Sequence, residues 1–168
     1  MTETPACPGC GFVHHDVAPA DVVVRLRRVM EEFDEILAGD SARLAVRPTP
    51  TRWSGWEYAG HVRDVLLSIR ERLILAVVTD HPTGTPIYRD ERVDSGFYAL
   101  DTSATLRRQL AVATDMLCDV LMTMPDDGWA RTMRYSPTTP LEVDLAWVAA
   151  QALHEVSHHL ADVRENLD

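Results

Sequence analysis

Three of the seven histidines lie together near the end of the chain, in the segment His154-Glu155-Val156-Ser157-His158-His159. Residues four apart on a helix are separated by only about 40° of rotation, so His154 and His158 can reach one metal ion from consecutive turns. Both histidines share an arc with apolar residues, which predicts that the pair faces inward. Two inward imidazoles need partners for their ring nitrogens, and a divalent metal is one such partner.

The same segment contains the HExxH pattern of zinc proteases, in which the glutamate is the general base. Metzincins continue with a glycine and a third histidine, but this chain has Ala161 and Arg164 at those positions. A rotation of about 100° per residue also turns Glu155 onto a polar arc and His159 away from His158. The sequence therefore argues against a zinc protease and leaves Glu155 and His159 outside the expected site.

A third ligand has to come from another helix, and His61 is the best placed histidine. It shares an inward arc of the second predicted helix, and Asp64 one turn later is suited to orient a neighbouring imidazole. Three neutral imidazoles with an open position fit Zn²⁺ first, with Ni²⁺ and Fe²⁺ as alternatives. The competing interpretation is three separate core histidines, each satisfied by hydrogen bonds.

A second group of candidate ligands lies near the N-terminus, where Cys7-Pro8-Gly9-Cys10 is followed by His14 and His15. Proline and glycine permit the tight turn that lets two thiolates face one ion, as in a zinc knuckle. The pattern is only half of a zinc site, so Cys7 and Cys10 form a tentative second metal site. A free N-terminal segment and a redox-active cysteine pair are the two alternatives.

Helical periodicity and capping signals predict the elements that must position these residues. Apolar residues recur at three and four residue spacing in four segments, 19–37, 54–78, 103–124 and 141–167. Four helices of this length bury their apolar stripes most simply as a four-helix bundle. The whole chain, residues 1–168, is therefore expected to be one all-α domain, with residues 1–17 as an N-terminal extension that carries the cysteine pair.

Two of the predicted connections, 79–102 and 126–139, are long for a bundle. Long loops in compact domains are often functional, so both are candidates for a lid, whereas a short helix and a hairpin without a role fit equally well. The first connection contains the charged segment Tyr88–Arg92, which is suited either to bind an anionic substrate or to remain solvated. The same two interpretations apply to Arg131, Arg134 and Tyr135 in the second connection.

Composition excludes several classes of partner. Lys and Arg number 16 against 26 Asp and Glu, which gives a net charge of −10, and none of the basic residues is lysine. A negative field of this size repels nucleic acid and anionic lipid surfaces. The sequence shows neither a signal peptide at its start nor an apolar stretch long enough for a membrane span, which predicts a cytoplasmic protein.

Two segments resemble the DinB/YfiT-like metalloenzyme superfamily and the related N-terminal domain of mycothiol-dependent maleylpyruvate isomerases. These segments are Trp53-Ser54-Gly55-Trp56-Glu57-Tyr58-Ala59-Gly60-His61 and His154-Glu155-Val156-Ser157-His158-His159-Leu160-Ala161-Asp162. The resemblance covers nearly the whole chain and implies up-down-down-up helix order with one long crossover, for which residues 79–102 are the natural candidate. It also implies a divalent metal held by His61, His154 and His158. The isomerase group has Glu where this chain has His154, so its specific reaction is not implied.

The resemblance also implies a function. Better understood members of the superfamily use the metal to activate a low-molecular-weight thiol such as mycothiol, which is consistent with the lowering of a thiol pKa by a bound cation. We therefore expect a metal-dependent enzyme that transfers the activated thiol, through its sulfur, to a small electrophile, with a homodimer as a further expectation from the family. The alternatives are a thiol-independent hydrolase or isomerase that uses metal-activated water, and a non-catalytic, metal-stabilised module that binds a small ligand.

Overall fold

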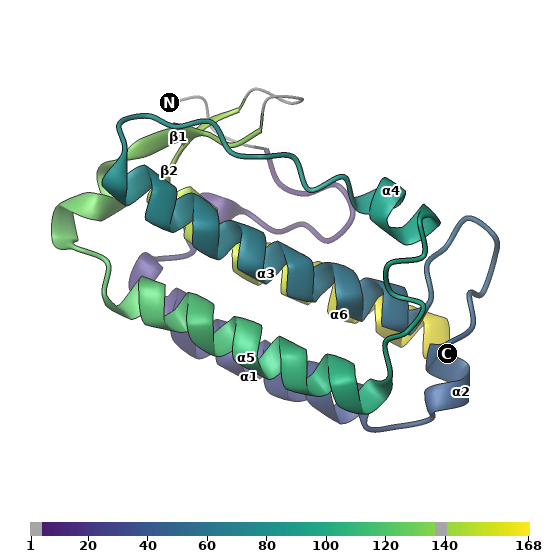
Figure 1. The fold of residues 1–168 in the computed structure, drawn as a ribbon. Coiled ribbons are helices and arrows are strands. Elements are labelled where there is room, and N and C mark those ends of the chain that lie inside the picture. The colour runs from purple at the N-terminus through teal and green to yellow at the C-terminus, as the bar shows by residue number, and fades with distance from the viewer. Residues whose placement is uncertain (1–4, 137–140) are drawn as a thin grey trace.

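The computed structural model describes residues 5–136 and 141–168. Within these residues, four long helices form a bundle and shorter elements fill the connections (Figure 1). The long helices are α1 (Pro19–Leu37), α3 (Gly55–Val78), α5 (Ser103–Met122) and α6 (Leu145–Leu167). The shorter elements are the helices α2 (Ser41–Leu44) and α4 (Arg89–Asp94), the 3₁₀ turns η1 (His14–Asp16) and η2 (Asp126–Ala130), and the strands β1 (Thr132–Arg134) and β2 (Glu142–Asp144).

Local signals explain where the first two long helices begin. Helix α1 begins at Pro19, which occupies the first turn, where its missing N–H group costs nothing. Helix α3 begins with a capping box, in which the Ser54 hydroxyl accepts from the backbone of Glu57 and the Glu57 carboxylate accepts from the backbone of Ser54. Both predicted starts are confirmed. Helix α5 ends at Met122, two residues before the predicted end.

The start of α6 differs from the prediction of residue 141. Residues 142–144 instead form β2, which pairs antiparallel with β1, and Met133 lies opposite Val143. The side chain of Asp144 then caps the helix by accepting a hydrogen bond of 2.8 Å from the backbone N–H of Trp147. The strand pairing is non-local, so helical periodicity could not reveal it.

The order of the helices is up-down-down-up, as the family resemblance implies. Helices α1 and α6 run in one direction, and α3 and α5 run in the other (Figure 1). Helix α3 packs against α5 and α6, and α1 packs against the same two helices. Fully buried side chains such as Leu26, Phe33, Leu66 and Val148 fill the space between them. Helix α6 is therefore covered on several sides.

The long crossover between the parallel helices α3 and α5 returns along the bundle and carries α4 (Figure 1). Near its start, the backbone N–H of Gly84 donates to the carbonyl of Arg134 over 2.8 Å, which joins the crossover to the β1–β2 hairpin. The backbone adopts a left-handed conformation at Tyr88, with φ of 50°, just before α4 begins. The two connections thus contain a short helix and a hairpin, and they lie against one another.

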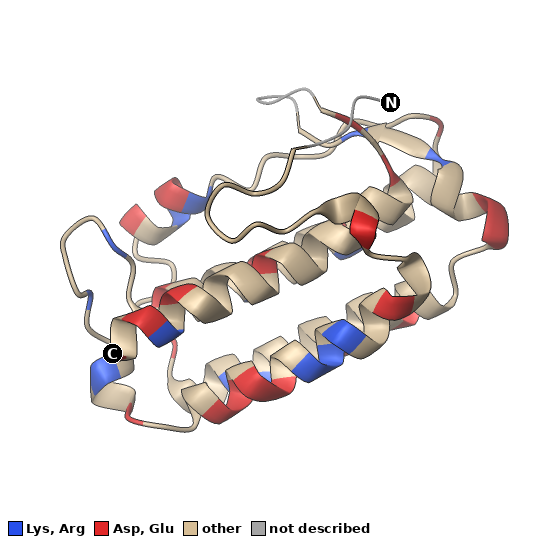
Figure 2. Cartoon of the chain, turned by 180° about the vertical axis from the view of Figure 1, so that it is seen from behind, with Lys and Arg blue, Asp and Glu red and all other residues tan. Residues whose placement is uncertain are grey.

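Charges of both signs are interspersed along the ribbons (Figure 2). None of the four long helices carries more Arg than Asp and Glu. Among the helices formed by residues 5–136 and 141–168, none has both the length and the apolar character that a bilayer span needs.

Candidate metal centres

Helix α6 presents two overlapping pairs of potential metal ligands, His154 with His158 and Glu155 with His159. Each pair is spaced by four residues, and the pairs are offset by one residue, so they lie on neighbouring faces of the helix. The structure assigns the pairs to different surroundings. Glu155 and His159 lie near His61 of α3, whereas His154 and His158 lie near Cys7 and Cys10.

The first cluster consists of His61, Glu155 and His159, whose potential ligand atoms lie within 4.8 Å of one another. The Glu155 Oε2 atom is 3.3 Å from His159 Nε2 and 3.6 Å from His61 Nε2. His61 is 2% exposed, and neither of its ring nitrogens has a hydrogen-bond partner among the described residues. A buried imidazole without partners, beside a carboxylate and a second imidazole, fits the requirements of a divalent cation.

The charges of the first cluster depend on one another. Burial alone would raise the pKa of Glu155, but the adjacent imidazoles of His159 and His61 outweigh burial and lower it. Burial lowers the pKa of His61, which favours the neutral imidazole that binds metals. Burial also disfavours protonated His159, but its contacts with Asp162 and Glu155 raise the pKa of His159. The metal-free cluster therefore holds a carboxylate close to one basic imidazole.

Asp162 fixes the orientation of His159. The Nδ1–H group of His159 donates to Asp162 Oδ2 over 2.8 Å, which leaves Nε2 directed toward Glu155. A carboxylate behind a histidine ligand is the usual arrangement at metal sites. Asp64, which we expected to orient an imidazole, has other partners, because its carboxylate accepts from Arg63 and Arg92 as well as from the hydroxyl of Tyr98.

The second cluster consists of Cys7, Cys10, His154 and His158, again with potential ligand atoms within 4.8 Å of one another. Cys7 Sγ is 3.8 Å from His158 Nδ1. Burial lowers the pKa of His154 to about 4, so this imidazole is neutral at neutral pH. Burial disfavours the Cys7 thiolate, but the backbone N–H groups of Cys10 and Gly9 outweigh this effect and lower the pKa of Cys7.

The three histidines expected to share one ion are therefore distributed over two clusters. No group of potential ligands in the described part of the chain joins His61 to His154 or His158. Glu155 and His159, which the sequence left outside the expected site, lie beside His61, and His159 is 6% exposed. The sequence did contain a signal for this pair, because Glu155 and His159 are four residues apart, as His154 and His158 are.

A pocket of about 620 Å³ opens beside the first cluster. Both ligand-bearing helices contribute to it, and the crossover and the segment after β1 complete its wall. The pocket is lined by His61, Val65, Arg72, Pro86, Ile87, Tyr88, Arg89, Glu91, Tyr135, Ser136, Leu141, Trp147, Gln151 and Glu155. Of the loop residues noted in the sequence, those that reach this pocket are Tyr88, Arg89, Glu91 and Tyr135. Arg131 instead binds the backbone carbonyls of Ala76 and Thr79.

Arg72 gives this pocket a buried positive charge. The residue is 6% exposed, and its guanidinium donates to Ser68 Oγ over 2.7 Å and to the carbonyl of Thr85 over 2.6 Å. Both partners are neutral, and Arg72 forms no ion pair with a described residue. The guanidinium also lies 4.5 Å from the ring centre of Tyr135. A buried cation without a counter-ion at the wall of a pocket favours an anionic ligand.

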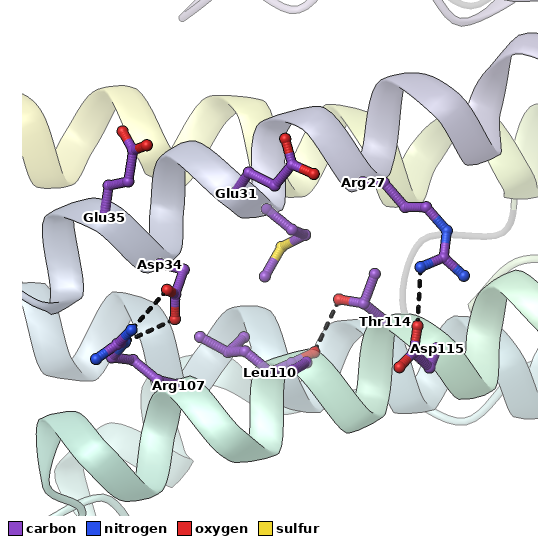
Figure 3. Close-up of a pocket in the computed structure, with 10 residues that line it drawn as sticks. Arg27, Glu31, Asp34, Glu35, Arg107, Leu110, Thr114 and Asp115 are labelled. Atoms are coloured by element: carbon purple, nitrogen blue, oxygen red, sulfur yellow. Dashed lines mark hydrogen bonds and ion pairs between the residues drawn. The ribbon is translucent and has the colours of Figure 1, made fainter.

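Another hollow, of about 470 Å³, lies between α1 and α5 and differs in character (Figure 3). Ion pairs flank it, with Arg107 against Asp34 at 2.7 Å and Arg27 against Asp115 at 3.0 Å. Its cations are thus already paired with acids, and none of the residues of either cluster lines it. The pocket beside His61 is therefore the better candidate for a ligand site.

The fold and the clusters define a helical-bundle protein with candidate metal centres. Residues 23–163 match the sequence model of the DinB superfamily, which is most of the chain. The protein belongs to the DinB superfamily. No curated protein sequence matches the chain at a significant level.

Solved structures with the same fold include YfiT from Bacillus subtilis, described as "a probable metal-dependent hydrolase with an unusual four-helix bundle topology". The TM-score is 0.80 at 15% identity, over 88% of this chain and 85% of YfiT. A mycothiol-dependent maleylpyruvate isomerase gives a TM-score of 0.72 at 15% identity, over 90% of this chain and 63% of the isomerase. The bundle thus corresponds to only part of the isomerase, and at this identity both similarities show the fold alone.

Proposed function

We propose that this protein is a divalent-metal-dependent enzyme whose reaction centre is the cluster of His61, Glu155 and His159. In this proposal the enzyme activates a low-molecular-weight thiol for transfer to a small electrophile that carries an anionic group. The observation that carries the proposal is His61, a buried imidazole with two unpartnered nitrogens beside the half-buried carboxylate of Glu155 and at the wall of a pocket. Two imidazoles and a carboxylate as ligands favour Zn²⁺, with Fe²⁺ or Ni²⁺ as alternatives.

When bound, a divalent cation supplies the positive charge that lowers the pKa of a coordinated thiol. The surrounding residues orient two of the three ligand side chains, Glu155 and His159. Gln151 Nε2 donates to Glu155 Oε1 over 2.6 Å, so that one carboxylate oxygen is fixed and the other faces the two imidazoles. Asp162 holds His159 in the tautomer whose Nε2 carries the lone pair. Three ligands from two helices leave room for a ligand that enters from the pocket.

The pocket combines two arginines with two glutamates, and Arg72, whose hydrogen-bond partners are neutral, is the group that favours an anionic electrophile. Arg72 offers a buried guanidinium, and the exposed Arg89, which pairs with Asp90 at 3.6 Å, lies at the pocket wall. Burial raises the pKa of Tyr135 to about 12, so its hydroxyl stays protonated and available as a hydrogen-bond donor. Apolar groups of Ile87 and Trp147 line the same space and limit the access of water.

Thiol dependence is supported by the comparison with the isomerase, which is described as mycothiol-dependent. As noted above, the isomerase group has a glutamate at the first position of the ligand pair on the last helix. The pair Glu155 and His159 has this composition, although it is displaced by one residue from His154 and His158. The description of YfiT favours the second candidate, a thiol-independent hydrolase.

The test uses the cobalt-substituted protein in a Cys7→Ser/Cys10→Ser background, so that the protein's own exposed thiols do not contribute. Addition of N-acetylcysteine is expected to produce an intense sulfur-to-cobalt charge-transfer band, whereas the matched alcohol N-acetylserine produces none. His159→Ala and His61→Ala are expected to abolish cobalt binding, and His154→Ala is expected to retain it.

Each other outcome favours a stated alternative. Cobalt binding without any response to the thiol would contradict thiol activation and favour the hydrolase or isomerase. Loss of cobalt in His154→Ala together with its retention in His159→Ala would instead favour the set of His61, His154 and His158 that was expected from the sequence. Absence of cobalt from the background protein would contradict the metal-dependent reaction centre altogether.

A further inference from the structure

The N-terminal segment folds back onto α6 and brings the cysteine pair to two of its histidines. The turn closes with a hydrogen bond of 2.7 Å from the Gly11 N–H to the Cys7 carbonyl, and the Cys7 N–H donates to the Phe12 carbonyl over 2.9 Å. Gly9 lies directly over the imidazole of His158, where an added Cβ would be 2.8 Å from Cε1. The backbone thus approaches α6 at a point that only glycine permits without a shift of the ring.

The polar neighbours of His154 and His158 indicate which ring nitrogens can bind a ligand. Gln151 Oε1 is 3.3 Å from His154 Nδ1, so this nitrogen carries the proton. The other ring nitrogen of His154, Nε2, is buried and has no partner among the described residues. His158 faces Cys7 with Nδ1 at 3.8 Å and Asp162 with Nε2 at 3.7 Å. His154 thus has one nitrogen bonded to an oxygen and one that is free for a ligand, and His158 directs Nδ1 at the sulfur of Cys7.

We propose that Cys7, Cys10, His154 and His158 bind one zinc ion as a closed tetrahedral site, separate from the cluster around His61. Two thiolates and two imidazoles are a complete ligand set for structural zinc. Sulfur and nitrogen ligands of one tetrahedral zinc lie about 3.6 Å apart, given their usual bond lengths. The Cys7–His158 distance of 3.8 Å is already close to this value, and the other ligand atoms need to move inward by about 1 Å or less.

The surroundings favour zinc over the other two interpretations of the cysteine pair. A free N-terminal segment does not require the close approach of Gly9 to His158 or the buried, unpartnered nitrogen of His154. A redox-active cysteine pair does not require the two imidazoles of α6 whose ring nitrogens lie within 4.8 Å of the thiol sulfurs. Gln151 behind His154 is the kind of outer partner that metal-binding histidines normally have, and Asp162, which accepts from His159, lies 3.7 Å from His158 Nε2.

The zinc site would fix one wall of the pocket. Its N-terminal segment continues into η1, where His14 stacks on Trp147 with ring centres 4.3 Å apart and contacts Gln151 Oε1 at 2.5 Å. Gln151 in turn holds Glu155. The proposed site therefore anchors residues that position the first cluster, without itself lying in the pocket.

The test does not depend on the first cluster, because that cluster is removed by His61→Ala. In this background, titration with Co²⁺ is expected to reach one equivalent and to give the strong thiolate-to-cobalt absorption and the visible bands of a tetrahedral site. Added Zn²⁺ is expected to displace the cobalt. Cys7→Ser/Cys10→Ser should abolish the thiolate absorption. His154→Ala or His158→Ala should weaken zinc binding by more than about 100-fold, because about 100-fold is the upper limit for loss of a residue that only hydrogen-bonds a metal ligand. His15→Ala, an exposed histidine of the same segment, is the matched control and should change nothing.

A second measurement covers the case in which a variant fails to fold. In the unaltered chain, zinc is expected to protect two of the three cysteines from a thiol-reactive dye, and a chelator is expected to restore their reactivity. Reactivity of Cys7 and Cys10 that is the same with and without zinc would overturn the proposal. Cobalt binding without thiolate absorption, or zinc affinity that is unchanged in both histidine variants, would also overturn it.

Discussion

Replacement of Arg72 by Met tests whether the buried guanidinium serves a ligand rather than the stability of the fold. The side chain is 6% exposed and has neutral partners only, Ser68 and the carbonyl of Thr85. Both partners belong to residues that are not buried, so they can turn to water when the guanidinium is removed. Methionine has a similar length and fills the space with an apolar chain.

The structure predicts a small change in stability because two effects nearly cancel. Arg72→Met loses two hydrogen bonds from a charged donor and one cation–π contact, about 4 kcal/mol in all. It also removes the desolvation cost of an unpaired buried ion, which is several kcal/mol in proteins. The free energy of unfolding should therefore change by no more than about 1 kcal/mol.

Urea denaturation of the metal-free protein measures this change, and Arg63→Met provides the comparison. Arg63 pairs with Asp64 and Asp101, each at 3.0 Å, so its removal leaves two partly buried carboxylates with fewer partners and should cost about 3 kcal/mol. Succinate, as an anionic probe, should raise the melting temperature of the unaltered protein and not that of Arg72→Met. The reasoning is refuted if Arg72→Met costs as much as Arg63→Met and succinate stabilises both proteins alike.

Three further predictions concern the cap of α3 and the first cluster. Ser54→Ala removes the capping box and should lower the free energy of unfolding by about 1 kcal/mol in urea denaturation, whereas an unchanged midpoint would contradict the role of the cap. Burial disfavours ionised Glu57, but Arg47 and Ser54 outweigh burial and lower the pKa of Glu57 below 4.5. The ionised carboxylate therefore stabilises the folded protein above pH 4.5, and this stabilisation is lost as the pH falls through the lowered pKa of the folded state. Glu57→Gln should flatten this acid limb of the pH–stability curve, and a curve of unchanged slope would rule the linkage out. In the Cys7→Ser/Cys10→Ser background, Asp162→Asn should weaken metal binding at the His61 cluster about 10- to 100-fold, measured by competition with a chelator. Unaltered affinity would show that Asp162 does not orient His159.

The sequence was sufficient for the features that local signals determine. The proline at the start of α1 and the Ser54–Glu57 box define where helices begin, and the structure agrees with both. The start of α6 was misplaced because Asp144 becomes a cap only after residues 142–144 have paired with β1. That pairing brings together residues from two sides of a connection, and helical periodicity contains no information about it.

The histidines show the corresponding limit for the candidate site. Helical-wheel reasoning assumes one buried arc, whereas α6 contacts α1, α3 and η1 and is therefore buried along several directions. His154 and His159 are both enclosed, but by different neighbours. The sequence showed which residue types could act as metal ligands. Their division into two clusters depends on the positions of α3 and of the N-terminal segment, which the sequence did not show.

The contact between the N-terminal turn and α6 has a consequence for how the chain folds. Cys7 and His158 are 151 positions apart, so the zinc site proposed above cannot close until nearly all of the chain, including most of α6, has been synthesised. Closing so long a loop is entropically costly, which makes it a late event that is absent from the folding nucleus. An interaction formed late changes the unfolding rate more than the folding rate. We therefore expect bound zinc to lower the unfolding rate and so to prolong the lifetime of the native state, while the refolding rate stays almost unaltered.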